Sequence, residues 1–174
     1  MPAPATPALT TFHFGDIRID RIVEMEIPFR SVDDSYAGLD RDAFDAVRPA
    51  FEPWALEPET EKLILAIQTY LIRTPHHTIL VDTCVGCGKT SKFFPGWHRR
   101  TDNAWLRRLA AAGVQPEAVD YVFCTHLHSD HCGWNTRLLD GRWVPTFPNA
   151  TYVMAEHEVM PMIAAERAGS ASPT

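Results

Sequence analysis

Polar and apolar residues alternate in the first part of the chain and then give way to continuous apolar runs. Residues 12–27 alternate isoleucines with charged side chains, which predicts an edge strand or a hairpin pair. Residues 63–72 are almost entirely apolar and predict a central strand. The segment Pro75-His76-His77 predicts a turn into a second apolar strand over 78–82. The pattern therefore predicts that the first half of the chain forms a β-sheet.

A helical period appears between two apolar strands. An apolar stripe predicts a helix over 103–112, capped by Thr101 or Asp102. The stripe consists of Trp105, Leu106, Leu109 and Ala112. Because this helix separates the strand over 78–82 from a strand over 121–124, the three segments predict a βαβ unit. The fold class is therefore α/β, with neighbouring parallel strands.

Shorter elements are predicted on either side of this unit. A short helix is expected near Arg41–Val47, and hairpin-like strands are expected around Trp143 and Tyr152. A last helix is expected from about residue 156 to 167.

Composition and charge narrow the class of protein. The chain has 174 residues, enough for one domain with a sizeable core. We expect that domain over residues 12–168. A disordered lead (1–11) would precede it, and a disordered tail (169–174) would follow it. The net charge of −6 argues against a nucleic-acid partner. No apolar run approaches the ~20 residues of a membrane span, and the start has no signal-peptide pattern, so the expected location is cytoplasmic.

Three imidazoles and one carboxylate follow the strand over 121–124. They are His126, His128, Asp130 and His131. In an extended segment His126 and His128 project to the same side, whereas a turn would direct Asp130 and His131 to a second point. Imidazole and carboxylate are ligands of borderline divalent metals such as zinc. The cluster therefore predicts two neighbouring metal positions, and the alternative interpretation is a histidine-rich surface loop.

This cluster resembles the His-x-His-x-Asp-His signature of the metallo-β-lactamase superfamily. Two further segments carry the resemblance. Thr78–Thr83 resembles the family strand that ends in an aspartate, and Phe147–Val153 with Glu158 resembles a segment of the lactonase-like and methyl-parathion-hydrolase-like branches. The resemblance extends from about residue 12 to about residue 160.

The resemblance implies the N-terminal part of an αββα sandwich, a mixed sheet with helices on its outer face. It also implies a zinc-dependent hydrolase with two Zn²⁺ per complete site, or with other divalent metals. In such an enzyme a metal-bound hydroxide attacks an ester, lactone, amide or phosphotriester. His126, His128, Asp130 and His131 would bind metal, and Asp130 would also be catalytic by orienting the nucleophile. Asp82 would accept hydrogen bonds that orient the metal loop.

The family completes its site with ligands further downstream, and this chain has no histidine after His157. The resemblance therefore implies only the N-terminal portion of the enzyme, incomplete or weakly active by itself. Its partners would be a small-molecule substrate and either a complementing C-terminal segment or a homo-oligomer. The alternative function is a catalytically inactive metal-binding or interaction module.

Aromatic residues near the cluster predict an apolar substrate pocket, with core packing as the alternative for each. They are Phe93, Phe94 and Trp97 in a glycine-rich loop, and Trp134 after the metal motif. The pair Cys84-x-x-Cys87 is interpreted as reduced thiols, because no second such pair completes a zinc site.

Overall fold

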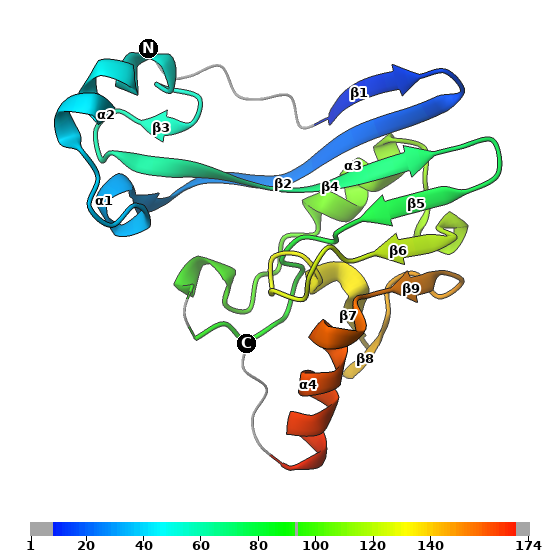
Figure 1. The fold of residues 1–174 in the computed structure, drawn as a ribbon. Helices are drawn as coiled ribbons and strands as arrows, with labels where there is room; N and C mark the ends of the chain where they lie inside the picture. Colours follow the sequence, from blue (N-terminus) through cyan, green and yellow to red (C-terminus); the bar gives the residue numbers. More distant parts are fainter. Residues whose placement is uncertain (1–8, 93, 170–174) are drawn as a thin grey trace. The chain divides into compact units, whose positions relative to one another are not determined.

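The computed structural model describes residues 9–92 and 94–169 (Figure 1). The predicted disordered lead lies largely outside these residues, but the first strand begins at Leu9, earlier than the domain start expected at residue 12. Most of the predicted tail, residues 170–174, also lies outside them.

Contacts divide the described chain into two compact units. The smaller contains residues 25–66, and the larger contains residues 9–24 together with 67–169 apart from Phe93. All the predicted metal ligands belong to the larger unit.

The strands form a mixed sheet, which confirms the predicted fold class. Within the described residues the order is β1-β2-β4-β5-β6-β9, and β3 pairs with β4. The strands are β1 (Leu9–Phe14), β2 (Ile17–Ser31), β3 (Leu56–Glu57), β4 (Lys62–Arg73), β5 (Thr78–Val81), β6 (Tyr121–Phe123) and β9 (Thr151–Val153). The pairs β1–β2 and β4–β5 are antiparallel, whereas β5–β6 and β6–β9 are parallel. The predicted β1–β2 and β4–β5 hairpins and the βαβ unit are present.

The strand at Tyr152 differs from the prediction. Trp143 lies in a separate hairpin, formed by β7 (Thr136–Leu139) and β8 (Arg142–Pro145). Tyr152 instead lies in β9 and is the register partner of Val122 in the parallel main sheet. Its hydroxyl donates to the carbonyl of Asn135 at 3.0 Å. Local turn signals predicted a hairpin because they carry no information about this pairing with a strand distant in the sequence.

The helices are short, and none in the described part of the chain is long and apolar enough to cross a membrane. They are α1 (Val32–Ser35), α2 (Arg41–Val47), α3 (Ala104–Ala111) and α4 (Glu156–Arg167). Helix α3 buries Trp105 and Leu109, and its first amide, at Ala104, donates to the carboxylate of Asp102 at 2.8 Å. The smaller unit holds α1 and α2, and the N-cap Asp40 of α2 accepts from the amide of Ala43.

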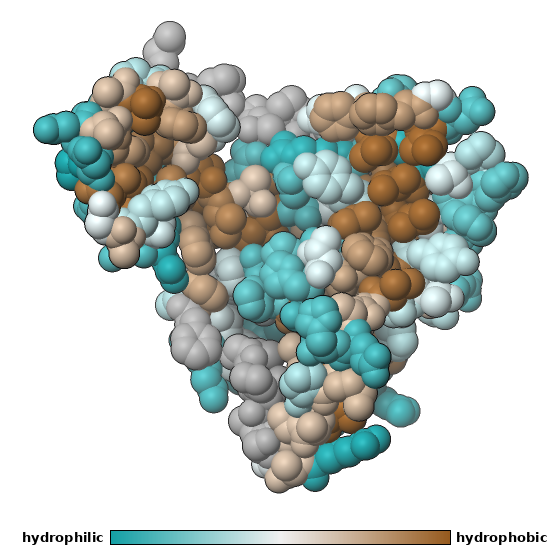
Figure 2. Space-filling model, in the orientation of Figure 1, coloured by the Kyte–Doolittle hydropathy of each residue, from teal (hydrophilic) through white to brown (hydrophobic). Residues whose placement is uncertain are grey.

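The two faces of the sheet differ sharply in burial. Leu71, Leu80 and Val122 are register partners across β4, β5 and β6, and all three are completely buried. The neighbouring residues along these strands point to the opposite face of the sheet, and they include Tyr70 and Phe123, which are exposed. Figure 2 shows hydrophobic side chains gathered over this part of the sheet. One face is therefore a core, and the other presents apolar side chains to solvent.

The backbone after β5 packs against the backbone that follows the histidine cluster. The amide of Thr83 donates to the carbonyl of His131 at 2.7 Å, and the amide of Gly133 donates to the carbonyl of Cys84 at 2.7 Å. A Cβ atom on Gly133 would lie 1.9 Å from the carbonyl oxygen of Val85. Gly133 is therefore required by close approach, which fixes the end of the histidine loop against the chain after β5.

Replacing Gly133 with alanine should destabilise the fold by about 1–3 kcal/mol, because backbone atoms must move to admit the methyl group. Gly96→Ala is the matched control, since a Cβ there meets nothing within 4 Å and no positive φ is involved. It should change stability by less than about 1 kcal/mol. Urea unfolding of both variants measures the difference; equal stabilities would contradict the close approach.

Candidate metal centre

The candidate site forms where two parallel strands end. Strands β5 and β6 pair in register, with Val81 opposite Phe123, so the residues that follow them leave from the same edge of the sheet. Asp82 follows β5, and the segment from Thr125 to His131 follows β6. The amide of Asp82 donates to the carbonyl of Phe123 at 2.8 Å, which continues the pairing one residue beyond the strand.

Asp82 joins the two strand ends through its carboxylate. Oδ1 accepts from the amide of Thr125 at 2.8 Å, and Oδ2 accepts from the Thr125 hydroxyl at 2.8 Å. Oδ2 also lies 2.8 Å from Nδ1 of His131. Asp82 has a φ of 59°, a left-handed conformation that Asp adopts more readily than most residues and that turns the chain directly after β5. Asp82 thus contacts both a loop amide and a cluster histidine, and its role in orienting metal ligands stays a prediction.

The Asp82–His131 contact shifts the pKa of both groups. Burial by itself would raise the pKa of Asp82, but hydrogen bonds from His131 and Thr125 outweigh burial and lower it. The hydrogen bond to Asp82 raises the pKa of His131, against an opposing effect of burial. When Nδ1–H donates to Asp82, the neutral ring has its lone pair on Nε2. This nitrogen, 3.5 Å from Oδ2 of Asp130, is the one available to a metal.

The donor atoms lie in two pairs. Nε2 of His126 and Nδ1 of His128 are 3.1 Å apart, and Nε2 of His131 and Oδ2 of Asp130 are 3.5 Å apart. Two donors sharing a tetrahedral zinc with bonds near 2.1 Å are separated by about 3.4 Å. The rings of His126 and His131 are 3.9 Å apart between centroids, so the pairs adjoin. The 3.1 Å separation is a hydrogen-bond distance between the two rings, and both separations lie within about 0.3 Å of the value for one shared ion.

The described residues do not gather three or more such side chains around one point. A catalytic zinc uses three protein ligands and an open position. The four predicted ligands therefore form two half-sites, and their roles in binding stay a prediction.

Glu24 is a buried carboxylate near the site that the sequence analysis missed. It accepts from the amide of Val85 at 2.9 Å and from Nε1 of Trp134 at 2.8 Å, and it lies 4.0 Å from the guanidinium of Arg100. Burial is the largest influence on its pKa and raises it. Glu24 therefore ties β2 to both loops that flank the site. Its partners lie far away in the sequence, so alternation within β2 gave no signal of this role.

Asn135 and Glu158 also support the loop. The side-chain oxygen of Asn135 accepts from the Thr83 hydroxyl at 2.8 Å, and its amide donates to the sulfur of Cys124 at 3.2 Å. A carboxylate oxygen of Glu158 accepts from the amide of Leu127 at 3.2 Å. Glu158 was noted in the sequence only as part of a resembling segment, and this contact gives it a structural role.

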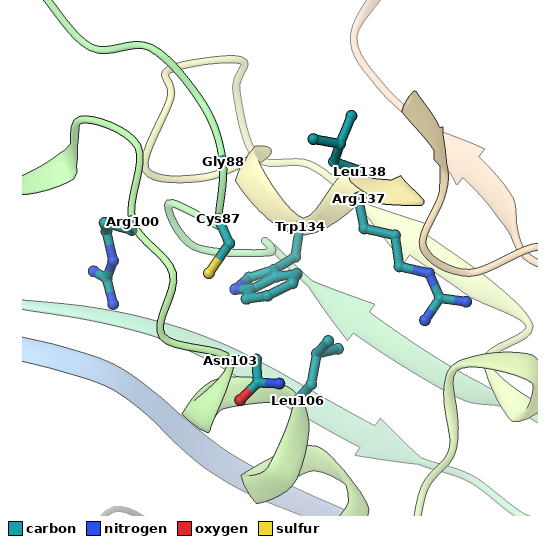
Figure 3. A pocket seen from close by; sticks show the side chains of 8 residues that line it. All are labelled: Cys87, Gly88, Arg100, Asn103, Leu106, Trp134, Arg137 and Leu138. Atoms are coloured by element: carbon teal, nitrogen blue, oxygen red, sulfur yellow. The ribbon is translucent and has the colours of Figure 1, made fainter. Parts of the chain in front are cut away.

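The predicted pocket aromatics do not form one group among the described residues. Phe94 and Trp97 contact each other, with ring centroids 4.2 Å apart, and Trp97 is buried. Trp134 stacks on Trp105 at 5.6 Å and lines a cavity of about 300 Å³ to which Phe94 and Trp97 do not contribute (Figure 3). Phe93 lies outside the described residues. Their role in substrate binding stays a prediction.

Cys84 and Cys87 form no disulfide in the structure, and their interpretation as reduced thiols outside a zinc site stays a prediction. Cys84 is completely buried, and its sulfur lies 3.3 Å from the Thr69 hydroxyl. Burial raises its pKa. Cys84 is therefore a packed thiol in this structure.

The model of the metallo-beta-lactamase superfamily matches residues 64–173, more than half of the chain. This chain therefore belongs to the metallo-beta-lactamase superfamily. A comparison with curated proteins finds no match.

Solved structures with the same fold include three hydrolases. The hydrolase AbOPH of the beta lactamase superfamily is 24% identical with a TM-score of 0.68, and the match covers 95% of this chain and 50% of that one. AidC, a dizinc quorum-quenching lactonase solved with the product N-hexanoyl-L-homoserine, is 20% identical with a TM-score of 0.66, covering 90% and 47%. A probable metal-dependent hydrolase from Staphylococcus aureus is 22% identical with a TM-score of 0.66, covering 88% and 52%. The chain spans about half the length of these proteins.

Replacing Asp82 with asparagine should destabilise the fold and change its response to acid. A carboxyl group with a lowered pKa in the folded state stabilises the fold above its unfolded pKa of about 4, and this contribution is lost as the pH falls through the folded value. At neutral pH Asp82→Asn should lower the free energy of unfolding by about 1–3 kcal/mol, because an amide group would face donors. As the pH falls, the free energy of unfolding of the Asp82→Asn variant should decrease less than that of the original chain.

Asp16→Asn, at an exposed position in the β1–β2 turn, is the control and should follow the original chain at every pH. Urea unfolding between about pH 3 and pH 7 provides the comparison. Parallel acid profiles for Asp82→Asn and the original chain would contradict the proposed source of the pKa shift.

Proposed function

We propose that this chain forms the N-terminal part of a zinc-dependent hydrolase that acts on a small-molecule ester, lactone, amide or phosphotriester. The observation that carries the proposal is the pair of donor spacings, 3.1 Å for His126 and His128 and 3.5 Å for Asp130 and His131. Membership of the superfamily and the likeness in fold to a dizinc lactonase and a probable metal-dependent hydrolase support it.

Each residue of the site has a distinct task in this proposal. His126 and His128 would hold one divalent ion, and Asp130 and His131 a second. A bound ion supplies Lewis-acid polarisation and lowers the pKa of water. Asp82 would keep the His131 ring oriented and, in the neutral ring, hold the proton on Nδ1, so that Nε2 presents its lone pair towards the site. The Asp130 carboxylate would orient the attacking water and accept its proton.

A metal-binding or interaction module without turnover is the second candidate function. It is favoured by one observation, that three or more donors do not converge within the described residues. Metal content and turnover must therefore be measured separately.

Replacing His126 and His128 together with alanine should abolish zinc retention, since both donors of one pair disappear. We expect zinc affinity to fall by at least about 100-fold, more than the loss of a supporting contact alone would produce. The matched control is His76→Ala with His77→Ala, which removes two histidines from the turn between β4 and β5. Metal analysis after dialysis should show zinc in the control and not in the first variant. Equal zinc in both would refute the assignment.

The 174-residue chain with zinc should hydrolyse lactones and aryl esters at rates close to those of free zinc. Losing one electrostatic stabiliser of the transition state costs roughly 10²–10³ in rate, and the chain spans only half of the hydrolases it matches in fold. Initial rates with and without a chelator test this. Efficient turnover that is lost both with the chelator and in the His126/His128 variant would show a complete site.

A further inference from the structure

The cavity beside Trp134 is separate from the candidate metal centre and has a different chemistry. Its volume is about 300 Å³, and none of the four predicted metal ligands lines it. Figure 3 shows it between the loop at Gly88, the start of α3 and strand β7. Trp134, Leu106 and Leu138 give it an apolar wall. This volume is at the lower limit of small-molecule sites, so a ligand must be small.

Two guanidinium groups give the cavity a positive charge. Arg100 and Arg137 both line it, and Figure 3 shows them on opposite sides of the Trp134 indole. No described residue that lines the cavity carries a carboxylate. The chain as a whole has a net charge of −6, so a cavity whose charged lining residues, among those described, are both arginines differs from its overall charge. The buried Glu24 carboxylate lies 4.0 Å from Arg100 and offsets its charge, so the cavity favours an anion beside Arg137.

Arg137 is half-buried, and one of its guanidinium nitrogens is unpaired within the described residues. Its Nε atom is buried and has no hydrogen-bond partner among the described residues. Leaving a buried donor unsatisfied is costly. The nearby Lys89 is committed, since its Nζ donates to the carbonyl of Thr136 at 2.8 Å and lies 4.3 Å from the Trp143 ring centroid. Arg137 is therefore a lining residue whose guanidinium the protein does not fully engage.

We propose that this cavity binds a small organic carboxylate with a flat apolar body, such as an aryl carboxylate. The carboxylate would accept hydrogen bonds from the Arg137 guanidinium, whose planar fork matches two carboxylate oxygens. The apolar body would lie against Trp134, Leu106 and Leu138. Arg100 contributes positive potential but is shared with Glu24, at 4.0 Å, so Arg137 is the specific anchor. The proposal does not depend on the proposed hydrolase activity.

Three probes with the same ring separate charge from shape: benzoate, phenyl phosphate and the neutral benzamide. Heteronuclear NMR or calorimetry with the metal-free 174-residue chain should show saturable binding of benzoate that weakens as salt is raised. Benzamide should bind at least about tenfold more weakly, because it lacks the charge. Tighter binding of phenyl phosphate than of benzoate would overturn the choice of carboxylate in favour of a phosphate ligand.

Arg137→Gln should weaken benzoate binding by about tenfold or more, since a charge-assisted bond is lost. Arg142→Gln is the matched control: it removes the same charge from an exposed position in the same β7–β8 hairpin and should leave binding unchanged within about twofold. Arg137→Lys, which keeps the charge but loses the fork, should give an intermediate affinity.

Circular dichroism checks that each variant is folded. If Arg137→Gln does not fold, the benzoate–benzamide difference in the original chain decides. Absence of saturable binding, or equal affinity in folded Arg137→Gln, would overturn the proposal.

Discussion

The carboxylate of Asp82 holds the candidate metal centre together. It accepts hydrogen bonds from the amide and hydroxyl of Thr125 and contacts Nδ1 of His131. One side chain therefore fixes the point at which the loop leaves β6 and the orientation of the His131 ring. A buried carboxylate without such partners would be costly. The contacts that satisfy Asp82 are therefore the same ones that orient the candidate ligand.

The two loops at the site also constrain each other through their backbones. Gly133 approaches Val85 so closely that no side chain fits between them. Glu24 then ties both loops to β2 by accepting from Val85 and Trp134. The candidate ligand residues follow a short three-residue strand, and this packing around them, more than the length of β6, restricts their positions.

Local patterns predicted most of the fold, and long-range contacts account for the misses. The apolar runs, the α3 stripe and the Pro75–His77 turn depend on neighbouring residues, so the sequence could indicate them. The His126–His131 cluster was found because its residue types and spacing are themselves local. Glu24 and the pairing of Tyr152 were missed because each depends on residues distant in the chain. The separation of Trp134 from Phe94 and Trp97 likewise depends on how loops pack.

The double use of Asp82 has an evolutionary consequence. A substitution there alters the stability of the β5–β6 junction and the basicity of His131 at once, so selection cannot act on one without the other. Asp130 is free of this linkage to the strand ends: its carboxylate contacts the neighbouring His131, and its side chain keeps 21% of its surface exposed. A substitution at position 130 would therefore leave the β5–β6 junction intact, whereas a substitution at position 82 would not.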